Sequence, residues 1–144
     1  MTSNTADNTS ALKTGGCLCG TIRYSIDAEP IAMAVCHCRN CQKQAGSALS
    51  VIAVFPRAAL SLTGTLKVFE DQGTSGQQVY RKFCPECGSP VITDTPAAKE
   101  DDIIFIKAGT LDDVSILKPT THYWTKSAQP WFTFPDDAEL LVQE

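Results

Sequence analysis

The sequence predicts a mainly β fold built from short antiparallel strands. Short runs rich in Val, Ile, Phe, Tyr and Thr alternate with turn residues along most of the chain. Segments with helical periodicity are few and short, and no long crossover helix separates the strand-like runs. Parallel sheets need such crossovers, so the pattern favours antiparallel strands over repeated β-α-β units.

Eight runs suit strands because they combine β-branched and aromatic residues with alternating polarity. They cover residues 21–27, 31–36, 48–55, 65–70, 78–83, 90–94, 102–109 and 121–126. Short helical turns are expected at 39–46, 56–60 and 111–117. Residues 72–78 and 95–102 are rich in turn-forming residues and read as loops, which either flank a ligand cleft or form plain exposed turns.

The chain has the length and composition of one ordinary globular domain. It holds 144 residues, of which 43% are hydrophobic, and we expect the domain to span residues 15–144. Residues 1–14 are polar and are expected to form a disordered tail rather than a secretory signal. No stretch reaches the roughly 18 apolar residues of a membrane span, so we expect a cytoplasmic protein with no membrane partner.

The charge pattern argues against nucleic acid as a partner. The formal net charge is −4, and no run of Lys or Arg forms a basic patch. Phosphate binding needs clustered positive charge. A small anionic ligand held by one or two arginines remains compatible with the composition, and a homo-oligomer is left open.

Cysteine is abundant for a chain without an export signal. The seven cysteines fall into three groups, "GGCLCG", "CHCRNC" and "FCPECGS". An odd number cannot all pair as disulfides, and in a reducing compartment such density indicates metal binding. We therefore expect metal sites, with zinc as the metal best suited to clustered thiolates.

Two of the three groups can form a closed tetrahedral site. Cys84 and Cys87 lie in a C-P-x-C-G motif, whose proline and glycine bend the backbone so that both sulfurs face one point. A structural zinc takes four ligands. Cys17 and Cys19 lie two residues apart among glycines, so both sulfurs can point to one face. We predict that these four cysteines hold a structural zinc.

The remaining group, Cys36, Cys38 and Cys41, can hold a second zinc with one open position. A zinc with three protein ligands keeps its fourth position for water or substrate. Alternatively, His37 or His122 closes the site, although His37 should point away from Cys36 and Cys38 in an extended segment. A third option is a redox role, in which these thiols form disulfides and release the metal.

At this level of detail the chain resembles a known family. The segments "GGCLCGTIRY", "CHCRNCQK", "FCPECGSP" and "LKPTTHYWTKSAQPW" occur in the order typical of the glutathione-dependent formaldehyde-activating enzyme and centromere protein V family. The resemblance spans about residues 15–131. It implies a β-tent fold with two zincs, on the same cysteine groups as above. It also implies a carbon–sulfur lyase-type activity that joins formaldehyde to glutathione as S-hydroxymethylglutathione.

The sequence gives less support for catalytic residues than for the candidate metal ligands. His37 and His122 are the two histidines and could act as general acid or base, with His122 placed in the pocket wall. Arg39 could pair with a glutathione carboxylate or offset the charge of the thiolates, and Trp124 could line the cleft. The alternative to an enzyme is a zinc-stabilised module that binds or carries glutathione or its adducts without turnover.

Overall fold

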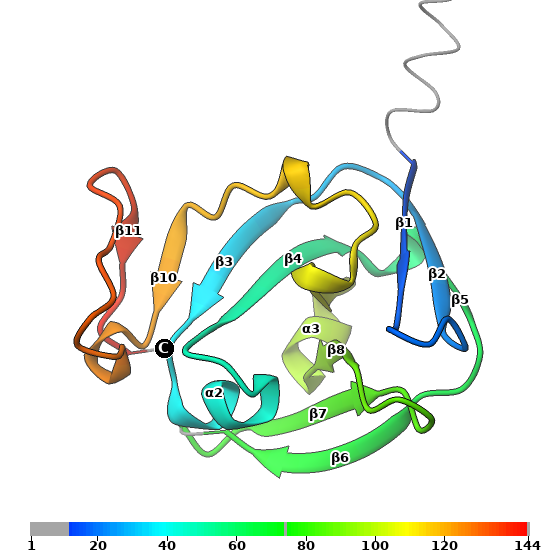
Figure 1. The fold of residues 1–144 in the computed structure, drawn as a ribbon, viewed down its shortest axis with the longest axis horizontal. Coiled ribbons are helices and arrows are strands. Elements are labelled where there is room, and N and C mark those ends of the chain that lie inside the picture. The colour runs from blue at the N-terminus through cyan, green and yellow to red at the C-terminus, as the bar shows by residue number, and fades with distance from the viewer. Residues whose placement is uncertain (1–11, 74, 144) are drawn as a thin grey trace, which may run out of the picture.

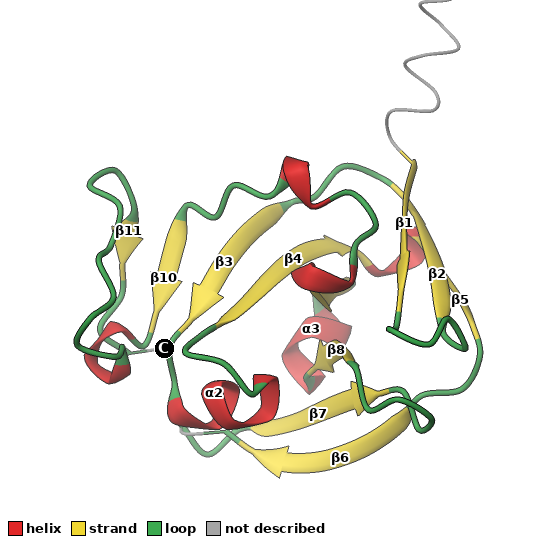
Figure 2. Ribbon diagram, in the orientation of Figure 1, coloured by secondary structure: helices red, strands yellow, loops and turns green. Residues whose placement is uncertain are grey.

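The fold is mainly β, as the sequence predicted, and is described here for residues 12–73 and 75–143 of a computed structural model. Two β-sheets and two short helices make up this part of the chain (Figures 1 and 2). The smaller sheet has the strand order β1-β2-β5 and the larger sheet the order β11-β10-β3-β4-β9-β8-β7-β6. The larger sheet curls, so that β6 and β7 lie opposite β3 and β10 in Figure 1.

The strands keep close to the expected positions. The bounds of the smaller sheet are β1 Leu12–Gly16, β2 Arg23–Asp27 and β5 Leu60–Thr63. Those of the larger sheet are β3 Ala32–Cys36, β4 Ser50–Pro56, β6 Lys67–Gln72, β7 Gln78–Phe83, β8 Pro90–Asp94, β9 Ile103–Lys107, β10 Thr121–Tyr123 and β11 Glu139–Leu140. Each of the eight predicted runs contains or overlaps one of these strands.

Most neighbouring strands pair antiparallel, but β10 does not. It pairs parallel with β3 on one side and with β11 on the other. The chain between β9 and β10 returns across the molecule through 3-10 turns at Ala108–Thr110 and Val114–Ile116 instead of a hairpin. That return lets β10 enter the sheet in the direction of β3, which the sequence pattern did not predict.

Strand β1 shows why part of the fold was missed. It begins at Leu12, so residues 12–14 belong to the sheet and not to the expected tail, whose remaining residues 1–11 lie outside the described structure. Its two glycines have low β propensity. A Cβ at Gly15 would collide with the Tyr24 hydroxyl and the Thr110 carbonyl, so the glycine permits close packing of this strand.

The two helices are α2 Arg39–Ala45 and α3 Pro96–Glu100. The first lies within the predicted turn at 39–46. The second corrects our interpretation of 95–102 as a loop. Thr95 caps it by accepting a hydrogen bond from Ala98 N at 3.0 Å, and Pro96 suits the first helical turn because its missing N–H needs no partner there. No helix in the described ranges is long and apolar enough to cross a membrane.

Strand β4 separates the core from a cavity. Ala53 and Phe55 are fully buried and belong to the main hydrophobic cluster, which also contains residues of the smaller sheet. The alternating residues Ser50, Ile52 and Val54 point to the other face and line a cavity. One strand therefore supports both the packed interior and the candidate site.

A buried ion pair fastens β8 to the connection after β4. Asp94 is fully buried and accepts two hydrogen bonds from Arg57, at 3.1 and 2.5 Å, while Lys82 lies 3.6 Å away. Burial alone would raise the pKa of Asp94, but the adjacent Arg57 outweighs it and the pKa is lowered. The pair therefore contributes stability while Asp94 is ionised.

We expect Asp94→Asn to lower the free energy of unfolding by about 3 kcal/mol at pH 7, because Arg57 would lose its buried partner. A lowered folded pKa gives stability that is complete above the unfolded value of about 3.9 and lost as the pH falls through the folded value. The difference from wild type should therefore shrink in acid. Urea unfolding at several pH values measures the free energy of unfolding of each variant, with the exposed Asp137→Asn as the control. Equal losses in the two variants would contradict this prediction.

Candidate metal centres and the cavity beside them

Four cysteines from two distant turns meet at one point. Cys17 and Cys19 lie in the turn after β1, and Cys84 and Cys87 lie in the turn after β7. Their sulfur atoms all lie within 4.8 Å of one another. The Sγ–Sγ distance is 3.6 Å between Cys17 and Cys19 and 3.8 Å between Cys19 and Cys84. The structure thus brings together the four cysteines that the motifs paired.

This spacing fits a tetrahedral metal. Zinc–sulfur bonds of about 2.3 Å place the sulfurs of a tetrahedron roughly 3.8 Å apart. Backbone N–H groups also point at the sulfurs, since Ile22 N donates to Cys17 Sγ at 3.2 Å and Glu86 N donates to Cys84 Sγ at 3.3 Å. Such hydrogen bonds stabilise thiolates and orient them. We call these four residues the four-cysteine site.

The thiols of this site do not ionise equally without a cation. Burial raises the pKa of Cys84 to about 11, whereas hydrogen bonds from Ser89 lower the pKa of Cys87 to about 5. Four adjacent negative charges would repel one another strongly. The donor set therefore fits a divalent cation that compensates them.

The second group lies where β3 meets α2. Cys36 ends the strand, Cys38 is the N-cap residue of the helix, and Cys41 lies in its first turn. Cys38 Sγ accepts a hydrogen bond from Cys41 N at 3.2 Å, which fixes the turn between them. The three sulfurs lie within 4.8 Å of one another, and no fourth Cys, His, Asp or Glu among the described residues joins the group. We call it the three-cysteine site.

Protons are shared unevenly in the three-cysteine site. Hydrogen bonds from Cys36 and Cys41 lower the pKa of Cys38 to about 2, and the same pairing raises the pKa of Cys36. The pKa of Cys41 is also raised, because the effects of Cys38 and of burial outweigh the opposing hydrogen bond to Cys36. One thiolate with two protonated neighbours is thus the favoured state without a cation.

Two buried cationic residues lie beside these thiols, and the sequence analysis missed both. Arg81 Nη1 lies 4.0 Å from Cys41 Sγ, and its Nε donates to Asp71 Oδ2 at 2.8 Å. Burial acts to lower the pKa of Arg81, but the bond to Asp71 outweighs it. Lys107 donates to Ser50 Oγ at 2.5 Å, and burial lowers its pKa. Each of these residues is a charged side chain on the inward face of a strand. That pattern could have indicated them from the sequence, but only after the faces of the strands had been assigned.

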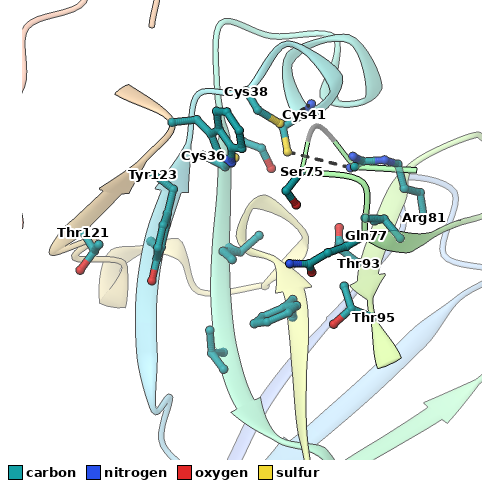
Figure 3. Close-up of a pocket in the computed structure, with 18 of the residues that line it drawn as sticks. Cys36, Cys38, Cys41, Ser75, Gln77, Arg81, Thr93, Thr95, Thr121 and Tyr123 are labelled. Carbon is teal, nitrogen blue, oxygen red and sulfur yellow. Dashed lines mark hydrogen bonds between the residues drawn. The ribbon is translucent and has the colours of Figure 1, made fainter. Parts of the chain in front are cut away.

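A cavity of about 380 Å³ opens from the three-cysteine site. Its lining comes mainly from one face of the large sheet, with Cys38 and Cys41 at the start of α2 and residues of the β6–β7 loop (Figure 3). Figure 3 shows the three cysteines at one end, with Arg81 on one side and Tyr123 on the other. Gly73, Ser75 and Gln77 contribute from the predicted loop at 72–78, and Thr95 from the second predicted loop. Both segments therefore flank the cavity.

The histidines lie elsewhere. His37 Nε2 and His122 Nδ1 share a hydrogen bond at 2.9 Å, and both rings contact Phe132 and Phe134. Neither residue lines the cavity. His122 was expected in the pocket wall, and this placement was wrong because its neighbours Thr121 and Tyr123 take the cavity-facing positions of the strand. Burial lowers the pKa of both histidines.

Of the two substrate-binding candidates, one lines the cavity and one does not. Trp124 lies in the lining, buried and with a positive φ of 57° that is strained for a bulky residue. Arg39 is exposed, bonds to Gln42 Oε1, and does not line the cavity. Arg81 occupies the position beside the thiols that we had considered for Arg39.

Comparison with known proteins now gives the family. The sequence model of the glutathione-dependent formaldehyde-activating enzyme family matches residues 12–127. The chain belongs to this family. The expected resemblance is confirmed, and its start coincides with the first residue of β1.

The fold of this formaldehyde-activating family member is also similar to a solved structure. A crystal structure of a Rhodobacter sphaeroides protein matches with a TM-score of 0.52 and 18% identity, over 74% of this chain and 91% of the other. At that identity the likeness concerns the fold alone. A search of curated proteins found no match.

We expect the two cysteine groups of this family member to respond differently to mutation. Cys84→Ser should prevent stable folding, because a four-cysteine metal site contributes roughly 10 kcal/mol, comparable to the whole stability of a domain. Cys38→Ser should stay folded and lose one metal equivalent, because the three-cysteine site closes only the local turn at α2. Circular dichroism melts and metal analysis would measure both. An unchanged Cys84→Ser melt, or equal damage in both variants, would contradict the distinction.

Metal binding at the three-cysteine site should weaken as the pH falls. The raised pKa values of Cys36 and Cys41 mean that a metal must displace two protons, so the affinity should change about 100-fold per pH unit. Competition against a chelator between pH 6.5 and 8 measures this, with Cys38→Ser reporting the four-cysteine site alone. A flat affinity across this range would show that the thiols are already ionised.

Proposed function

We propose that this protein is a zinc-dependent carbon–sulfur lyase-type enzyme, which forms or cleaves the S-hydroxymethyl adduct of a glutathione-like thiol and formaldehyde. The observation that carries the proposal is the three-cysteine site at the end of a cavity, with no fourth ligand among the described residues, in a chain of the formaldehyde-activating family. The reaction suits a cytoplasmic protein, because glutathione is a cytoplasmic thiol.

The two cysteine groups have separate tasks in this proposal. The four-cysteine site holds a structural zinc that joins the β1–β2 turn to the β7–β8 turn. Cys36, Cys38 and Cys41 hold a second zinc. When bound, that zinc lowers the pKa of an incoming thiol so that a thiolate is present at neutral pH. Removing the first ion threatens the fold, whereas removing the second threatens the activity.

Arg81 and Lys107 balance the charge of the thiol end. Three thiolates and one divalent cation carry a net charge of about −1, and a substrate thiolate adds another negative charge. Arg81 beside Cys41, and Lys107 behind Ser50, place positive charge at this end of the cavity. Their attraction acts in a partly buried setting, where charges are screened less than in water. These residues therefore favour binding of an anionic sulfur.

The bond changes are simple. The substrate sulfur attacks the aldehyde carbon, a C–S bond forms, and the carbonyl π electrons move to the oxygen, which takes up a proton. The Ser50 hydroxyl accepts the Lys107 hydrogen bond with a lone pair, so it can donate its own proton to that oxygen while the Lys107 ammonium replaces it. Lys107 then regains, through solvent, the proton that the substrate thiol released on becoming a thiolate. Ser50 lines the cavity, whereas His37 and His122 do not. The reverse sequence cleaves the adduct.

Exchange spectroscopy by NMR tests the enzyme against a carrier module. In an equilibrium mixture of glutathione, formaldehyde and their adduct, zinc-replete protein should speed interconversion well above the spontaneous rate. Cys38→Ser, folded but lacking the second zinc, is the matched control. Tight binding of glutathione without faster exchange would favour a non-catalytic binding or carrier protein and overturn the proposal.

Lys107→Met should weaken thiol binding while sparing zinc. Methionine keeps much of the length and removes the positive charge, so we expect roughly tenfold weaker binding of glutathione, the order expected for one nearby unit charge. Isothermal titration would measure the dissociation constant, and metal analysis would confirm two zincs. Lys99→Met on the exposed side of α3 is the control. Equal affinities of wild type and Lys107→Met for glutathione would show that Lys107 does not contribute to thiol binding.

A further inference from the structure

The cavity extends well beyond the space that formaldehyde needs. Along β3, Cys36, Ala34 and Ala32 all line it, so it runs about 13 Å from the thiols to the far end of the strand. Formaldehyde adds a single carbon to the substrate sulfur. A cavity of about 380 Å³ falls within the range that holds a larger small molecule.

The far part of the cavity is uncharged, and the wall formed by β3, β4 and β9 is apolar. Val54 pairs with Ala32 and with Phe105 in the sheet, and all three line this part of the cavity. Thr93, which pairs with Phe105 on one side and with Arg81 on the other, adds a polar but uncharged side chain, as do Gln77 and Thr95. Arg81 is the single charged residue among the described lining residues, and its guanidinium lies at the thiol end, against Cys41.

This lining suits an apolar chain better than a tripeptide. Glutathione carries two carboxylates and one ammonium group, and burying a charge without a partner is costly. Arg81, already paired with Asp71, could serve one carboxylate at most. The peptide part of glutathione is therefore better placed outside the apolar wall of the cavity, which leaves that wall free for another group.

We propose that the site takes a sulfur compound with an apolar chain of several carbons next to the sulfur, and that the chain lies along Ala34, Ile52, Ala32, Val54 and Phe105. This inference rests on the proposed function, because the sulfur must bind at the three-cysteine site. The chain could belong to the thiol itself or to the aldehyde, since a longer alkanal forms the same kind of hemithioacetal with glutathione.

Calorimetric titration of the zinc-replete protein with ethanethiol, butanethiol and hexanethiol tests the apolar chain. Each added methylene should tighten binding about fourfold, as expected for its transfer out of water. The heat-capacity change of binding should also become more negative with chain length. If ethanethiol and hexanethiol bind equally well, the inference is overturned and the proposed function stands. If none of these thiols nor glutathione binds, the proposed function itself fails.

A cavity-filling variant tests where the apolar chain of the ligand lies. Ala32 is exposed at the far end of β3, so Ala32→Phe should fold while shortening the cavity. It should weaken hexanethiol binding at least tenfold and leave ethanethiol binding unchanged. Ala97→Phe, on the exposed face of α3 and outside the lining, is the matched control. Equal hexanethiol affinity in both variants would place the chain elsewhere and overturn the inference.

A comparison of two aldehydes shows whether the apolar chain of the ligand belongs to the thiol or to the aldehyde. NMR exchange with glutathione and hexanal, compared with formaldehyde, should show faster interconversion for hexanal if the aldehyde supplies the chain. In that reaction the thiol sulfur bonds to the carbonyl carbon and the thiol proton ends on the oxygen. If hexanethiol binds tightly but hexanal exchange is not accelerated, the thiol supplies it. Acceleration confined to formaldehyde, together with chain-independent thiol binding, would reject both sources.

Discussion

Repulsion among clustered thiolates is the constraint on which this structure depends. Seven cysteines gather in two groups, each with sulfurs within 4.8 Å of one another. Such groups cannot ionise fully without a compensating cation, and the divided pKa values of Cys36 and Cys38 express this directly. The four-cysteine site joins turns that belong to different sheets. The three-cysteine site has no such task, because it lies within a single strand-to-helix turn, and it faces a cavity instead.

The cavity shares its strands with the core. On β4, Phe55 packs inward while Val54 and Ile52 line the cavity, so neither face can shift without disturbing the other. Strand β3 carries Cys36 at its end, and register with Ser50 on β4 sets the position of that thiol. The turn that carries the three cysteines is thus held by the sheet itself, which agrees with the proposed role of presenting a sulfur in one orientation.

Sequence spacing was enough to define the three cysteine motifs, since thiols two or three residues apart in a turn lie close together. The meeting of Cys17 and Cys19 with Cys84 and Cys87 was predicted from the four ligands that a structural zinc takes. Sequence spacing was also enough for most strands. It could not reveal β1, whose glycines pack against Tyr24, nor the parallel placement of β10, which depends on the long return from β9. Arg81 and Lys107 were not predicted as site residues for a related reason. Arg81 approaches Cys41 across the curled sheet, and Lys107 reaches Ser50 from the neighbouring strand β9, so neither contact can be assigned before the strand faces and pairings are known.

The placement of the histidines changes how the site should work. His37 and His122 share a hydrogen bond among phenylalanines, with lowered pKa values that keep them neutral at physiological pH. The groups beside the thiols are instead Arg81, held by Asp71, and Lys107, held by Ser50. An arginine keeps its charge throughout the physiological range. In the proposed reaction, selectivity would then come from positive charge and from the shape of the cavity, so the pH dependence should reflect the cysteine thiols rather than imidazole.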